Sequence, residues 1–146
     1  MQPNTRQAKL DQQVLFLPSV FNETLNLLFD AHQYFQARGA EEQSIITPMD
    51  RPIYAAEMSR ITMRLTSVMA WIMVRKAVFS GKIDEELAGE KYRLDAAEFC
   101  LTPKPYALDN LPYYINYLSD KSRELYARVY RLDALAYGAK PGSVIQ

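Results

Sequence analysis

Apolar residues recur every three or four positions along most of this chain, which is the period of an α-helix. The first such row begins after Ser19, whose hydroxyl can cap a helix, and ends before Gly39, a residue suited to a left-handed helix terminus. We therefore expect a first helix over residues 19–38. Its apolar row consists of Val20, Thr24, Leu27, Leu28, Ala31, Tyr34 and Phe35.

A second, longer helix is expected over residues 51–80. Asp50 can cap it, and Pro52 falls in the first turn, where a missing N–H does no harm. Gly81 is placed to end it. At about 1.5 Å per residue, this helix would span roughly 45 Å.

The second half of the chain predicts one short helix and one long one. The short helix is expected over residues 84–98, interrupted by Gly89, and two prolines that follow it prevent its continuation. The last helix is expected from residues 110–112 to about 137, with an apolar seam at four-three spacing, typical of bundle packing. The seam is Leu111, Ile115, Leu118, Ser122, Leu125, Val129, Leu132 and Ala136.

These elements predict an all-α fold, an antiparallel three-helix bundle with one additional short helix. The expected organisation is a flexible leader over residues 1–17, a helical domain over 18–137 and a flexible tail over 138–146.

The second helix is apolar on two sides. Its broad face suits the interior of a bundle, whereas a bundle this small has difficulty covering the other face as well. A second copy of the chain is the simplest cover, so we expect a homodimer. The second face is formed by Ala56, Met63, Ala70, Met73, Val74 and Ala77.

A narrow charged sector lies between these two faces. It holds Glu57, Arg60, Arg64 and Arg75, with Trp71 and Ser67 among them. One interpretation is a solvated stripe with a Glu57–Arg60 pair. The other is a partner-binding surface, because Arg and Trp are enriched among interface hot spots. In that case, reversing Arg60 and Arg64 to Glu would leave the fold intact and abolish partner capture.

Composition narrows the class of protein. The 146 residues include 17 basic and 17 acidic side chains, so there is no net electrostatic footprint for nucleic acid. The N-terminus lacks the apolar core of a signal peptide. The longest uncharged run in the second helix, residues 65–74, is about half of the roughly 20 residues that a membrane span needs. We expect a cytoplasmic protein.

Candidate catalytic chemistry is sparse. The sole histidine, His32, lies on the flank of the first expected helix, and the sole cysteine, Cys100, has no evident activating partner. There is no Gly-rich phosphate loop, no Cys/His metal spacing and no Glu-x-x-His pair for a diiron bundle. We expect neither an enzyme nor a cofactor or metal site.

The second helix also carries a family resemblance. Its sequence resembles an alphaproteobacterial helical family, once known only as a domain of unknown function, whose characterised member is the regulator of CtrA degradation. The resemblance covers roughly residues 20–137 and is most specific around the second helix. The matching positions are Tyr54, Ala55, Glu57, Arg60, Thr62, Arg64, Leu65, Trp71, Ala77, Val78, Gly81 and Ile83.

This resemblance implies a homodimeric adaptor that binds a ClpXP-type AAA+ protease, usually with an accessory adaptor, and tethers protein cargo in cell-cycle control. The chain departs from the family pattern at Ile61, Lys76 and Lys82, which stand at the usual Leu, Arg and Glu. Its tail is also shorter than that of the characterised member, in which a longer disordered tail takes part in partner binding.

Two alternatives remain open. The Arg60, Arg64, Arg75 and Lys76 side chains could meet phosphates, as in a dimeric helical regulator associated with DNA or transcription, although no helix-turn-helix pattern supports this. A bundle that binds a small molecule is the other.

Overall fold

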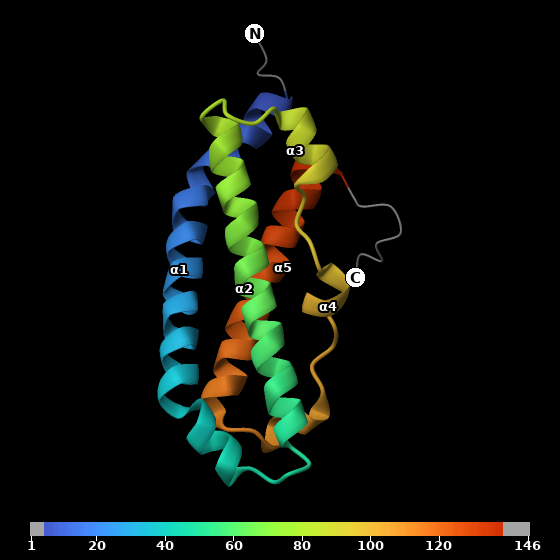
Figure 1. Ribbon diagram of the computed structural model, residues 1–146. Helices are drawn as coiled ribbons and strands as arrows, with labels where there is room; N and C mark the ends of the chain where they lie inside the picture. The colour runs from blue at the N-terminus through green and yellow to red at the C-terminus, as the bar shows by residue number, and fades with distance from the viewer. Residues whose placement is uncertain (1–4, 139–146) are drawn as a thin grey trace.

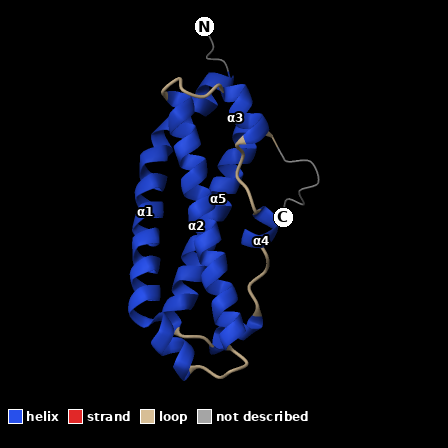
Figure 2. Ribbon diagram, in the orientation of Figure 1, coloured by secondary structure: helices blue, strands red, loops and turns tan. Residues whose placement is uncertain are grey.

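The computed structural model describes residues 5–138 and shows an all-helical molecule (Figures 1 and 2). The all-α prediction is confirmed, and the described part contains no strand. Three helices are long: α1 (Thr5–Ile45), α2 (Arg51–Phe79) and α5 (Tyr113–Tyr137). Between α2 and α5 the chain forms the short helices α3 (Glu85–Lys91) and α4 (Ala97–Cys100) and the 3₁₀ turn η1 (Tyr106–Asn110).

The three long helices pack against one another in all three pairings. Contacts of Tyr34 with Tyr114 and of Glu23 with Arg128 show that α1 runs antiparallel to α5. Helices α2 and α5 run parallel, because the segment from α3 to η1 returns the chain to the opposite end before α5 begins (Figure 1).

Helix α1 is much longer than the sequence predicted. It continues through Pro18, which removes one backbone donor, because Leu17 and Val20 beside it are anchored in the core. It also continues through Gly39, which is buried. A Cβ atom added at Gly39 would lie 3.9 Å from the Met58 Cε atom of α2. The expected ends of this helix at residues 19 and 38 are therefore wrong, and residues 5–17 of the predicted leader are helical.

Helix α2 matches its predicted bounds. Gly81 follows it with a φ of 77°, and the Lys82 and Gly81 amides donate to the carbonyls of Ala77 and Val78. This is the Schellman pattern that a glycine after a helix predicts.

The predicted short helix is divided in two. Residues 92–96, which we name the strap, cross the surface between α3 and α4 without helical structure. The interruption lies there and not at Gly89, which is inside α3. Side chains of α2 and α5 bind the strap's backbone groups in place of helical partners: Arg75 donates to the Tyr92 carbonyl, and the Leu94 amide donates to Asp133.

The core lies along the three long helices. Large side chains that are fully buried include Ile61, Leu65, Ile72, Ile115, Leu118 and Leu125. No helix in residues 5–138 has the length and apolarity needed to cross a bilayer.

Candidate functional site

The structure places the predicted charged sector of α2 largely inside the molecule. The exposed fraction is 1% for Glu57, 2% for Arg64, 1% for Arg75 and 3% for Trp71, while the Arg60 side chain is 19% exposed. The solvated-stripe interpretation is therefore wrong for four of the five residues. A partner-binding role for the five stays a prediction, and in the single chain their polar atoms face α5, α4 and the strap.

Three of the five meet in one group, which we name the Glu57 cluster. Glu57 accepts from Arg60 at 2.8 Å through one carboxylate oxygen. Its other oxygen accepts from Arg64 at 3.2 Å and from the Ser119 hydroxyl of α5. A buried carboxylate with three donors, two of them cationic, is compensated for the loss of water.

Arg64 connects three elements at this point. Its Nε donates to the Cys100 carbonyl at the end of α4 at 2.9 Å. Its Nη1 lies 3.3 Å from both the Ser119 carbonyl and the Ser122 hydroxyl of α5. Burial lowers the pKa of the Arg64 guanidinium and the Glu57 charge opposes that shift. The role of Arg64 here is to hold α4 and α5 against α2.

Arg60 lies at the outer edge of the cluster. Its guanidinium carbon is 5.2 Å from the centre of the Phe99 ring in α4, and that ring is 39% exposed. A partner that approaches α4 therefore meets Phe99 and part of Arg60, with the Glu57–Arg64 pair behind them.

The other two predicted residues join a second group, the Asp133 cluster. Asp133 of α5 accepts from the Trp71 indole at 2.9 Å and from Arg93 of the strap at 3.0 Å. Arg75 donates to Tyr137 at the end of α5, and its guanidinium lies 5.1 Å from the centre of the Trp71 ring and 4.7 Å from that of Tyr137. Burial lowers the pKa of Arg75, and this shift is opposed by Tyr137 and Asp133.

Sequence reasoning missed the partners of these residues. Ser122 alone gave a signal in the sequence, because it is a polar residue within the apolar seam of the last helix and such a position can face a buried charge. Asp133 and Ser119 gave no such signal, because each lies beside the seam, where a polar residue usually faces water. Arg93 falls in the strap, which was expected to be helical.

Two of the four residues of the basic sector that could have met nucleic acid are not available, while Lys76 is exposed and Arg60 partly so. The guanidinium groups of Arg64 and Arg75 are buried and bound to protein acceptors, so they cannot reach a phosphate. Among residues 5–138, no group of three or more His, Cys, Asp or Glu side chains could hold a metal ion.

Cys100 has the surroundings of a core residue. It is fully buried, and burial raises the pKa of its thiol to about 11, with a partial opposing effect from Arg64. A thiol that is neutral and covered at physiological pH is a poor nucleophile.

These features define a small helical protein whose charged residues hold its helices together. The chain belongs to the family described as "Protein of unknown function (DUF1465)", whose model matches residues 9–145. No curated protein matches the sequence.

Among solved structures, the chain is similar to the crystal structure of RcdA, the regulator of CtrA degradation, from Caulobacter crescentus CB15. The two share 26% sequence identity at a TM-score of 0.69, and the match covers 86% of this chain and 93% of that chain. The resemblance noted in the sequence is thereby confirmed in the fold.

Proposed function

We propose that this protein is a non-enzymatic, cytoplasmic adaptor that helps to deliver selected regulatory proteins to a ClpXP-type AAA+ protease in cell-cycle control. The observation that carries the proposal is the similarity to RcdA over most of both chains. Its partners would be the protease unfoldase, an accessory adaptor and protein cargo. Tethering would raise the concentration of cargo at the protease without chemistry by the adaptor.

The exposed residues over the Glu57 cluster are the surface that we propose for a partner. Phe99 and Arg60 lie together at the surface of α4 and α2, and aromatic and arginine side chains are enriched in interface hot spots. Glu57 and Arg64 would act indirectly by holding α4 in place. Trp71 and Arg75 would do the same for the strap.

We also propose that the protein is a homodimer, in which each protomer is a three-helix bundle. The antiparallel arrangement with one additional short helix that the sequence predicted holds for α1 against α5 but not for α2 and α5, which run parallel, and two short helices, α3 and α4, are present. Of the predicted second apolar face, Ala56, Met63, Ala70 and Met73 are exposed, and no exposed residue of α2 from Pro52 to Met73 is charged. We call this stretch the outer surface of α2. Depletion of charge is the signature of an interface core. Leu25 and Phe29 of α1 extend this surface, since they continue a row from Phe21, which contacts Lys76 of α2.

The adaptor proposal is tested by affinity capture of the tagged full chain from its own cells, with mass spectrometry of the bound proteins. We expect recovery of the unfoldase or its accessory adaptor, and loss of that recovery in Phe99→Ser. Tyr113→Ser is the matched control, because Tyr113 is another exposed aromatic residue, 81% exposed, far from α4. Capture of neither protein by the wild-type chain would contradict the proposal.

A further inference from the structure

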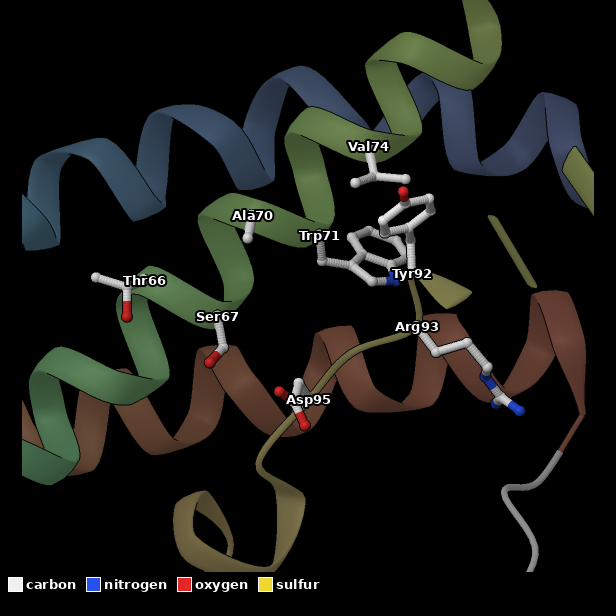
Figure 3. A pocket seen from close by; sticks show the side chains of 8 residues that line it. All are labelled: Thr66, Ser67, Ala70, Trp71, Val74, Tyr92, Arg93 and Asp95. Carbon is white, nitrogen blue, oxygen red and sulfur yellow. The ribbon is translucent and has the colours of Figure 1, made fainter. Parts of the chain in front are cut away.

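A small hollow opens between α2 and the strap (Figure 3). Its volume is about 240 Å³, which suits one long side chain rather than a drug-sized ligand. Ala70, Trp71 and Val74 of α2 and the ring of Tyr92 give it an apolar part. Ser67 and Asp95 lie at the other end, where their side chains approach one another.

The charge at that end is uncompensated. Asp95 is exposed, and one of its carboxylate oxygens accepts only the neighbouring Ala96 amide, at 2.7 Å. No cation among the described residues pairs with it. Arg93 also lines the hollow, but its guanidinium points away from Asp95 and binds Asp133 and the Gly138 carbonyl.

The strap that forms one wall is held firmly from behind. Arg75 binds the Tyr92 carbonyl, Asp133 binds the Leu94 amide, and the Tyr126 hydroxyl donates to the Asp95 carbonyl. These contacts come from both α2 and α5, so the hollow exists before any ligand arrives. A preformed site loses less entropy on binding.

We propose that this hollow binds the side chain of an arginine or lysine from a partner polypeptide. The aliphatic stem would lie against Ala70, Val74 and the Tyr92 ring, and the cationic group would reach Asp95. Long basic side chains combine an apolar stem with a charged end, and the hollow has the same two parts in the same order. This proposal depends on the proposed adaptor function in one respect only, namely that a partner polypeptide exists.

The test uses the single tryptophan of the chain as a reporter. The Trp71 indole borders the hollow, so a bound ligand should shift its N–H signal in the NMR spectrum of the full chain. N-acetyl-arginine methylamide would be added to about 10 mM, because ligands of this size bind in the millimolar range. The citrulline analogue, which has nearly the same shape and no charge, would be titrated beside it.

We expect the arginine compound to bind about three to five times more tightly than the citrulline compound, the upper range for an exposed charge pair. Asp95→Asn should remove this preference. Asp109→Asn, a change at an exposed carboxylate in η1, should preserve it. The signals of residues far from the strap report that each variant is folded.

Three results would overturn the proposal: no shift at the highest concentration, equal shifts with both compounds, or an unchanged preference in Asp95→Asn. The variant Lys140→Gln tests whether the occupant of the hollow is the chain's own Lys140, which follows Gly138 by two residues. A response to the arginine compound that appears only in Lys140→Gln would assign the hollow to the chain's own tail, and not to a partner.

Discussion

Arg64 shows what a buried charge requires of the residues around it. Its guanidinium stays charged at any physiological pH, so the folded chain must replace the water it loses with acceptors and a counter-charge. Glu57, Ser119, Ser122 and the Cys100 carbonyl do so. The same residue type on a helix surface would contribute little to stability.

Reversing Arg64 should therefore unfold or strongly destabilise the protein. Arg64→Glu would place two carboxylates side by side in the core, and breaking a buried pair costs about 3–5 kcal/mol. This differs from the sequence expectation that Arg60→Glu with Arg64→Glu leaves the fold intact. Urea denaturation measures the change in the free energy of unfolding, with Arg131→Glu, an exposed charge reversal on α5, as the control. A loss no larger than that of the control would show that Arg64 is not structural.

Cys100 predicts a loss of stability in alkaline solution. Its pKa is raised from 9.0 to about 11 in the fold, chiefly by burial. The folded state therefore favours the protonated thiol, and this contribution is complete below pH 9 and declines as the pH rises toward 11. The decline should reach about 1–3 kcal/mol.

The measurement is the free energy of unfolding in urea between neutral pH and about pH 11. Cys100→Ala should show a smaller decline than the wild type over this range, although its stability at neutral pH is also lower. Tyr54, whose pKa burial raises to about 12, contributes a decline of its own that both proteins share. Equal slopes in the two proteins would refute the assignment to Cys100.

At the scale of the helical elements, α3 is fitted to the end of α5 through a glycine. A Cβ atom at Gly89 would lie 2.6 Å from the Tyr137 Cδ1 atom, closer than non-bonded atoms approach. The Tyr137 ring is held in turn by Arg75 and lies 5.8 Å from the Arg93 guanidinium. The small residue at Gly89 thus permits α3 to cover the Asp133 cluster.

Gly89→Ala should destabilise the protein by about 1–3 kcal/mol, as overpacking does elsewhere. The sign should reverse when Tyr137 is first changed to Ala. Without the ring there is no collision, and alanine favours a helix by up to about 1 kcal/mol over glycine. Thermal or urea unfolding of the four proteins in this cycle checks both signs. A loss of similar size in the Tyr137→Ala background would rule out the steric explanation.

The success of sequence reasoning at this scale depended on whether local signals governed the element. The bounds of α2 followed from Pro52 and Gly81, whose effects are local. The predicted cap at Asp50 was wrong, because its side chain makes no capping hydrogen bond and accepts from the Thr47 hydroxyl instead. The helix ends predicted beside Pro18 and Gly39 were wrong, because tertiary packing outweighs the helix-breaking tendency of these two residues in α1. The strap could not be foreseen, because its backbone is bound by Arg75 and Asp133, residues far away in the sequence.

In the candidate site, too, local spacing was predicted correctly and tertiary surroundings were not. The pattern of α2 correctly brought Glu57, Arg60 and Arg64 together, and Trp71 with Arg75, because residues three, four or seven apart share a helix face. Whether that face was exposed depended on α5 and α4, which a helical wheel of α2 does not contain. Exposure is thus a property of the assembled helices rather than of any one of them.

For the whole molecule, the uncharged outer surface of α2 predicts self-association. Met63→Glu with Met73→Glu should convert a dimer to a monomer, because like charges facing one another across an interface cost several kcal/mol. That corresponds to at least a hundredfold rise in Kd, at about 1.4 kcal/mol per factor of ten. Both side chains are exposed in the single chain, so the fold should persist.

Light scattering over a range of concentrations measures this change. Leu135→Glu is the matched control, since Leu135 is 60% exposed on α5, away from the outer surface of α2. A wild-type protein that remains monomeric at high micromolar concentration would refute the dimer. A control that dissociates equally would place the interface elsewhere.

The end of α5 would have a mechanical consequence if, as proposed, the protein works beside an unfolding protease. A pull on the chain beyond Gly138 would be transmitted first to the Gly138 carbonyl, bound by Arg93, and to Tyr137, bound by Arg75. Both arginines are tied to other elements, through Asp133 and the Tyr92 carbonyl. The load would spread at once over α2, α5 and the strap instead of unwinding one helix from its tip. On the proposed function, an adaptor with this arrangement would resist being unfolded and degraded by its own protease.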